Sequence, residues 1–158
     1  MSVDLAVKVR LGLGDLATVR EQLSPLIAMP PDSKVGVIET AAACAMLHSF
    51  YTEIEKILKL VARGLDGPLP ASDAWHKELL NRMAAPTHAR PAVITTDLVQ
   101  ALSEFLAFRH LFRGASIALM RWDKLAPLIA RVDPVYRQAK REIEAFCGFL
   151  QSQGEHPA

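Results

Sequence analysis

Residues 35–61 read VGVIETAAACAMLHSFYTEIEKILKLV, a long run with helical spacing. Its apolar residues recur at steps of three and four, which is the spacing of one face of an α-helix. They are Val35, Ile38, Ala42, Ala45, Tyr51, Ile54, Leu58 and Val61. The stretch therefore predicts a long amphipathic helix that Asp32 or Ser33 caps and Gly64 ends. The small residues at 41–47 indicate a close helix–helix contact.

Helical patterns continue on both sides of this stretch. A first helix is expected from Val3 to Ile27, with Gly12 and Gly14 weakening its middle and Pro30-Pro31 ending the element. The later helices are expected to begin at Ser72, at Thr95 or Thr96, at Asp123, and at Asp133-Pro134. Gly114 is expected to interrupt the helix that begins at Thr95 or Thr96, and Gly154 to close the last helix.

The fold class follows from these patterns. No strand-like alternation persists, so the sequence predicts an all-α bundle of five to six helices, two of them long and antiparallel. The chain of 158 residues, 51% of them hydrophobic, has the length of one domain. We expect a single domain over residues 1–153 and a loose tail over residues 154–158.

Composition limits the functional classes. No apolar run approaches the roughly 20 residues of a membrane span. Charged side chains at Asp4, Lys8 and Arg10 interrupt any signal-peptide core, so a soluble, cytoplasmic protein is expected. Cys44 and Cys147 each lie in an apolar helical pattern and are interpreted as buried free thiols. The sequence shows no metal-ligand spacing and no cofactor motif.

Positive charge is concentrated towards the C-terminal third. Residues 1–104 hold ten Lys/Arg and twelve Asp/Glu, whereas residues 105–141 hold eight Lys/Arg and only two Asp. Ordinary solvated helix faces explain such a bias, and so does a positive surface for a polyanion such as RNA. Arg113, Arg121 and Lys124 are the candidate RNA-binding residues of this segment.

The segment FRHLFRGAS, residues 108–116, gives the sharpest chemical hypothesis. Arg109 and Arg113 are four residues apart, so they share a helix face that can clamp a phosphodiester. A salt-bridged or dimer-contact pair of arginines is the alternative. His110 is rotated by about 100° from Arg109, so it cannot serve the same point unaided.

Three other titratable residues are interpreted as structural. His48 is expected at the edge of the core, and His76 at the surface. Glu55 is expected to form an ordinary pair with Lys59, four residues later on the same helix.

Several blocks of the sequence resemble the HepT-like proteins of the HEPN superfamily. They are SFYTEIEKI at 49–57, WHKELL at 75–80, RPAVI at 90–94, FRHLFR at 108–113 and WDKLAPL at 122–128. The likeness runs from about Ala41 to Leu150. It implies a HEPN-like helical fold, a homodimer, and a metal-independent endoribonuclease that is the toxin of a toxin–antitoxin pair. It also implies a small nucleotidyltransferase-like antitoxin as partner.

The family's catalytic motif is an arginine, four to six residues, a histidine, one residue and a tyrosine. Arg109 matches the arginine. The histidine position then falls on Gly114 and the tyrosine position on Ser116. A histidine is suited to deprotonating the ribose 2′-hydroxyl, whereas glycine supplies no such group. In the family the tyrosine can also receive a nucleotide from the antitoxin, a role that Ser116 puts in question.

Three accounts of this departure stay open. The chain is a natural degenerate HEPN protein, an altered version of an active enzyme, or an enzyme in which His110 acts as the base. Arg109, His110, Gly114 and Ser116 are therefore the candidate catalytic positions. If the chain acts on RNA, Arg109 binds the scissile phosphate and Arg113 adds a second clamp. A non-catalytic helical interaction module and a ligand-binding bundle are the alternatives.

Overall fold

The computed structural model describes residues 2–155, and these residues form five α-helices with no strand among them. The helices are α1 (Ser2–Ile27), α2 (Val37–Val61), α3 (Trp75–Ala84), α4 (Thr96–Gly114) and α5 (Trp122–Glu155). A π-helical turn at Ala62–Asp66 extends α2, and a 3₁₀ turn at Ile117–Leu119 precedes α5. The prediction of an all-α bundle is confirmed.

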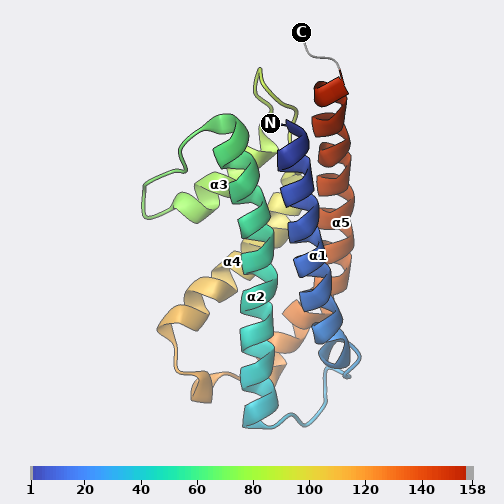
Figure 1. The fold of residues 1–158 in the computed structure, drawn as a ribbon. Helices are drawn as coiled ribbons and strands as arrows, with labels where there is room; N and C mark the ends of the chain where they lie inside the picture. The colour runs from blue at the N-terminus through green and yellow to red at the C-terminus, as the bar shows by residue number, and fades with distance from the viewer. Residues whose placement is uncertain (1, 156–158) are drawn as a thin grey trace.

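Three long helices form the body of the bundle, where the sequence predicted two. The chain runs along α1 and returns along α2, so these helices are antiparallel, and α5 lies beside α1 (Figure 1). The expected break at Asp133-Pro134 was wrong, because α5 continues through Pro127 and Pro134. Asp133 pairs with Arg20 of α1 at 2.6 Å instead of capping a helix. Tertiary packing thus outweighs the hydrogen bond that each proline removes.

The ends of α2 also differ from the prediction. Its N-cap is Gly36, which has no capping side chain, and neither Asp32 nor Ser33 caps it. Helical structure passes through Gly64 and ends at Gly67, whose φ of 94° is a conformation that other residues rarely adopt. Gly64 instead lies against Leu5, where an added Cβ would be 3.0 Å from that side chain. It therefore permits a close approach of α1.

The buried face of α2 follows the predicted stripe only in its second half. Tyr51, Ile54, Leu58 and Val61 are buried as expected. In the first half, Ile38, Ala42 and Ala45 are exposed and the buried residues are Thr40, Ala43, Cys44 and Leu47. The apolar pattern of this half fits two faces, and packing against the neighbouring helices selects one of them.

The shorter helices confirm some of the expected boundaries. Thr95 caps α4 by accepting a hydrogen bond from the backbone N–H of Leu98, and α4 ends at Gly114. Ser72 does not cap α3, since its hydroxyl meets Glu78 instead. Gly154 does not close α5, which continues to Glu155, and residues 156–158 lie outside the described part of the chain.

The core runs the length of the bundle. Both cysteines are free and buried in it, as expected. Four residues with polar or charged side chains are buried as well: Thr40, Glu55, His76 and Arg90. None of the described helices has the length and apolar character needed to cross a membrane.

Candidate functional site

Arg109 lies on the side of α4 that faces α2 and α3, and it is half-buried. Its Nη1 atom is 3.2 Å from Nε2 of His76. Its Nε atom is buried and has no hydrogen-bond partner within residues 2–155. A buried guanidinium N–H without a protein acceptor is costly, and its hydrogen-bonding capacity is unused within the described chain.

His76 is the residue that holds Arg109. It lies on α3 and is only 5% exposed. Its Nδ1 atom is 2.6 Å from Oε2 of Glu55 on α2, and Glu55 is itself only 3% exposed. Arginine can only donate, so Nε2 of His76 must accept and its proton must sit on Nδ1, which donates to Glu55. The chain of contacts therefore fixes a neutral imidazole in one tautomer.

The electrostatics agree with this assignment. Burial lowers the pKa of His76 below its usual value, against the opposing effect of the Glu55 carboxylate. The ring of Trp75 stacks on that of His76 with centroids 3.6 Å apart, which helps to shield it from water. Arg109 is therefore not locked onto a carboxylate, because a neutral histidine separates its guanidinium from Glu55.

Further polar groups of α2 line the same region. His48, Tyr51, Thr52 and Glu55 follow the three-and-four spacing of one helix face. Nδ1 of His48, the hydroxyl of Tyr51 and the hydroxyl of Thr52 are buried without a partner among the described residues. Burial, followed by the charge of Glu55, raises the pKa of Tyr51.

Both arginines of the sequence motif act on His48. Burial lowers the pKa of His48, and the charges of Arg109 and Arg113 lower it further. The His48 ring packs against Phe112 with centroids 5.4 Å apart. Arg113 is exposed and forms no ion pair within the described chain. The charges of both arginines therefore reach His48, and their joint role as a phosphate clamp stays a prediction.

His110 also lies next to His76. It is exposed, and its ring meets the edge of the His76 ring with centroids 5.6 Å apart. A hollow of about 340 Å³ between α3 and α4 is lined by both histidines together with Ser103, Leu106, Asp73 and Lys77. His76 therefore connects Arg109 with the hollow in which His110 lies.

The two positions that depart from the family motif are at the end of α4. Gly114 is exposed, and a Cβ added there would meet no described atom within 4 Å. Ser116 is exposed and precedes the 3₁₀ turn. The structure accordingly has room for a larger residue at position 114.

Arg121 and Lys124 lie apart from this group, around the start of α5. Arg121 pairs with Asp123 at 2.9 Å, and Lys124 is exposed. Arg121 lines a different hollow, which is shared with residues 31–35. No contact among the described residues links either cation to Arg109.

The sequence did not reveal Glu55, His76 and His48 as members of the site. Lys59, the expected partner of Glu55, lies over the Trp75 ring at 5.5 Å from its centroid. His76 is buried, where a surface position was expected. The block WHKELL at 75–80 was the available signal for His76. This block contributed to the family resemblance, but its residues did not suggest a chemical role.

These observations define an all-helical protein with a positively charged polar site between α2, α3 and α4. The chain belongs to the HepT-like family of the HEPN superfamily, because the family model described as HepT-like protein matches residues 42–150. No curated protein and no solved structure matches the chain. The match covers α2 to α5 almost entirely and leaves α1 outside.

Proposed function

We propose that this HepT-like protein binds RNA, with Arg109 and Arg113 holding a phosphodiester, and that its cleavage of RNA is weak or absent. The unpartnered Nε of Arg109 is the observation that carries the proposal. A phosphate oxygen is the acceptor that a guanidinium prefers, and the exposed Arg113 on the same helix face supplies a second cation. The exposed Arg113 would meet an anion that enters from solvent, and the anion would reach the buried Nε of Arg109 once that side chain turns outward.

Weak cleavage follows from the groups that are present. Attack by the 2′-hydroxyl requires a group that accepts its proton. Nε2 of His76 already accepts a hydrogen bond from Arg109, so its lone pair is occupied. No hydrogen bond among the described residues joins His110 to Arg109, and Gly114 has no side chain. The proposal therefore favours a degenerate toxin-type endoribonuclease over one in which His110 is the base.

The proposal extends to partner and location. In this proposal the chain is the toxin-type member of a cytoplasmic toxin–antitoxin pair, with a small nucleotidyltransferase as antitoxin. The exposed hydroxyl of Ser116 stands where the family's tyrosine receives a nucleotide. A nucleotidyltransferase gene beside the gene for this chain would support the pairing. Incubation of the two purified proteins with ATP would then show whether Ser116 is modified.

One experiment tests the RNA-binding core of the proposal. Labelled single-stranded RNA is incubated with the wild type, Arg109→Ala and Gly114→His, all with a metal chelator. We expect the wild type to bind with little cleavage. We expect Arg109→Ala to bind RNA at least about tenfold more weakly, because it loses one charge-assisted hydrogen bond. Gly114→His, which the open space admits, is expected to cleave about 10²–10⁴-fold faster. Equal binding by wild type and Arg109→Ala contradicts the proposal.

A non-catalytic interaction module is the second candidate, favoured by an apolar surface near the end of α4. Its exposed members are Leu111, Ile117 and Leu119 around the end of α4, with Val37 and Ile38 at the start of α2. The two groups belong to one region because α2 contacts the 3₁₀ turn. If no variant binds RNA, and Leu119→Asp abolishes binding of the neighbouring gene's product, this candidate replaces the first.

A further inference from the structure

The hollow between α3 and α4 takes no part in the phosphate contacts proposed above. Its volume is about 340 Å³, within the range of pockets that bind small molecules. Its lining includes the buried Leu106, and Asp73, Lys77 and Ser103 supply polar groups. An apolar wall with a few polar groups is the composition of a site for a small, partly polar ligand, or for one part of a larger ligand.

Two imidazole rings give this hollow aromatic walls. The rings of His76 and His110 have centroids 5.6 Å apart and planes inclined at 77°. His76 is held by Glu55 at 2.6 Å and stacked on Trp75 at 3.6 Å, so its orientation is fixed, whereas His110 is exposed. A flat heterocycle can therefore stack on His110 and meet the ring of His76 edge-on. Proteins hold the bases of single-stranded RNA on aromatic side chains in this way.

The polar groups of the hollow are free to bind a ligand. Asp73 and Lys77 are exposed, and neither forms an ion pair within residues 2–155. The hydroxyl of Ser103 donates to the carbonyl of Val99 at 2.7 Å, so its oxygen can still accept. The hollow thus offers a carboxylate and a hydroxyl oxygen that accept, and an ammonium that donates.

A guanine base matches these groups better than the other three bases do. Its N1–H and its 2-amino group are adjacent donors that one carboxylate accepts together, and its O6 is an acceptor for an ammonium. Adenine and cytosine each offer a carboxylate one amino group, and uracil offers one ring N–H. Asp73 and Lys77 together would therefore distinguish guanine by its additional donor.

We propose that this hollow binds a guanine base of single-stranded RNA, on the nucleotide adjoining the phosphate that Arg109 holds. The inference rests on the proposed function, since the base belongs to the strand bound there. His76 joins the two sites, because its Nε2 is 3.2 Å from Arg109 while the residue also lines the hollow. Asp73 accepts from N1 and the 2-amino group, Lys77 donates to O6, and His110 stacks on the base.

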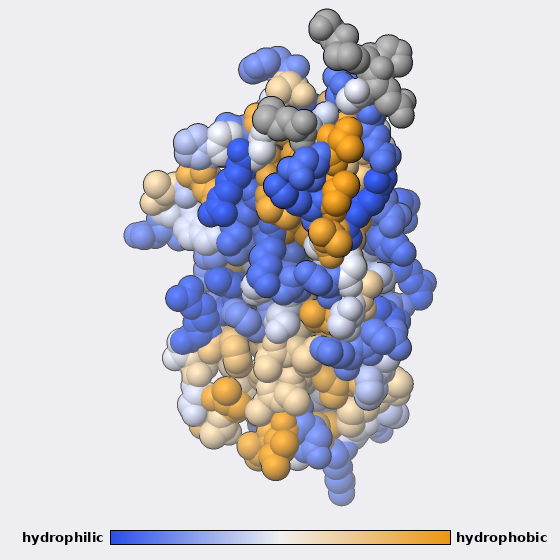
Figure 2. Space-filling view, viewed as in Figure 1, coloured by the Kyte–Doolittle hydropathy of each residue, from blue (hydrophilic) through white to orange (hydrophobic). Residues whose placement is uncertain are grey.

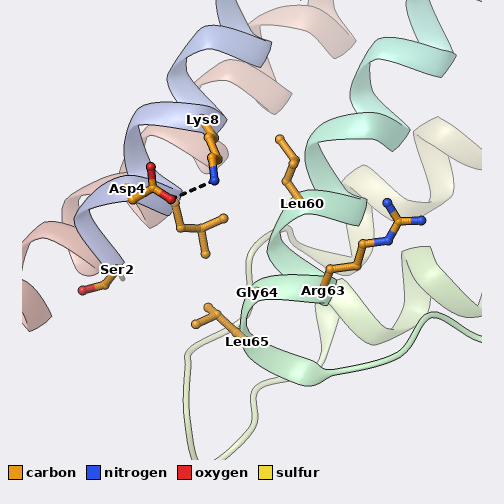
Figure 3. Close-up of a pocket in the computed structure, with 8 residues that line it drawn as sticks. Ser2, Asp4, Lys8, Leu60, Arg63, Gly64 and Leu65 are labelled. Atoms are coloured by element: carbon orange, nitrogen blue, oxygen red, sulfur yellow. Dashed lines mark hydrogen bonds and ion pairs between the residues drawn. The ribbon is translucent and has the colours of Figure 1, made fainter.

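A larger hollow of about 520 Å³, between α1 and the end of α2, lacks these features (Figure 3). Leu5, Leu60 and Leu65 line it, and no aromatic residue is among its described lining residues. Asp4 and Lys8 in its wall pair with each other at 2.8 Å. Figure 2 shows apolar surface over this end of α1, between hydrophilic surfaces. A flat polar base has no ring to stack on there, so the smaller hollow is the better base site.

The base preference is measured by fluorescence anisotropy with labelled RNA. The strands are an all-uridine strand and three uridine strands that carry one central guanosine, inosine or adenosine. We expect the guanosine strand to bind about tenfold more tightly than the all-uridine strand, the gain from one base recognised by paired hydrogen bonds. Inosine, which lacks the 2-amino group, should lose most of this gain. Equal affinities for the four strands, or a preference for adenosine, overturn the proposal.

Variants locate the preference in the hollow. Asp73→Asn should bind the guanosine and all-uridine strands alike, whereas Asp15→Asn, a change at an exposed acid of α1, should retain the preference of the wild type. His110→Ala should weaken binding of the guanosine strand about tenfold, and His110→Phe, which keeps an aromatic ring, should preserve it. A preference that survives in both Asp73→Asn and His110→Ala overturns the base site.

The outcomes distinguish this inference from RNA binding at Arg109. If Arg109→Ala weakens binding of all four strands and the wild type does not distinguish them, the phosphate contact stands and the base site fails. If the guanosine strand keeps its advantage and its full affinity in Arg109→Ala, the base site stands and the phosphate contact fails.

Discussion

At the scale of single residues, the contacts from Glu55 through His76 to Arg109 define the site. A buried carboxylate and a half-buried guanidinium would attract each other directly if nothing lay between them. The imidazole keeps them apart, 2.6 Å from the one and 3.2 Å from the other. Arg109 is thereby held in place while part of its hydrogen-bonding capacity stays free for an anion.

Two substitutions of His76 separate its two contacts. The amide of Gln reaches about as far as Nε2, whereas the amide of Asn reaches about as far as Nδ1. We expect His76→Gln, which retains an acceptor for Arg109, to keep most of the RNA affinity. His76→Asn, which retains only the contact with Glu55, should lose it nearly as Arg109→Ala does. Fluorescence anisotropy with labelled RNA measures this, and equal affinities for the two variants would show that His76 does not position Arg109.

The buried His76 and the half-buried His48 predict a pH dependence of stability. The pKa of His48 and of His76 is lowered in the folded state from the ordinary value of 6.5. The neutral imidazoles therefore stabilise the fold fully above that value, and this contribution is lost as the pH falls through the lowered pKa values. We expect the urea midpoint to drop as the pH falls below 6.5, and to drop less in His76→Gln, which has no proton to gain. An identical drop in both proteins would contradict the assignment of a neutral His76.

At the scale of elements, packing decides where helices continue. In α5 the residues Ile129, Val132 and Val135 are all buried around the two prolines, so an interruption there would remove apolar surface from the core. Burying one such side chain contributes about 1.5–3 kcal/mol, comparable to the cost of a helical proline. The helix therefore passes through positions at which the local sequence indicates an end.

Two glycines predict opposite effects on stability. Gly67 has a φ of 94°, so Gly67→Ala strains the backbone and should destabilise the fold by about 1–3 kcal/mol. Gly148 lies exposed inside α5, with no described atom near an added Cβ, so Gly148→Ala should stabilise it by up to about 1 kcal/mol. Chemical denaturation measures both, and the same sign for the two variants would be inconsistent with these backbone conformations.

At the scale of the whole molecule, charge is distributed unevenly over a chain whose net charge is only +1. Much of the positive charge after residue 104 is already paired: Arg121 with Asp123, Arg131 with Glu104, and Arg137 with Asp133. The folded surface of this segment therefore carries less unpaired positive charge than the sequence suggests. Arg113, without an ion pair in the described chain, is the stronger candidate for binding RNA.

The salt dependence of RNA binding tests this view. Each phosphate contact on a single strand contributes about −0.7 to the slope of log K against log salt concentration. We expect Arg113→Ala to reduce the slope by about that amount, whereas Arg121→Ala, whose charge Asp123 already offsets, should change it less. Lys124→Ala serves as the comparison for an exposed cation at the start of α5. Equal slopes for all four proteins would exclude a phosphate contact at Arg113.

Local patterns in the sequence were enough to predict the fold class, the HepT-like family, the cap at Thr95, the end of α4 at Gly114 and the burial of both cysteines. These follow from helical spacing, capping chemistry and the order of motif blocks, all of which are local along the chain. The sequence did not determine that α5 is continuous, because proline marks a helix end unless distant packing opposes it. Nor did it place Glu55 and His76 beside Arg109. Glu55 and His76 are 21 positions apart in the sequence, and His76 and Arg109 are 33 positions apart. Only the packing of α2, α3 and α4 brings these three residues together. A buried hydrogen-bonded group is a property of that packing, so the tertiary structure alone decided the site.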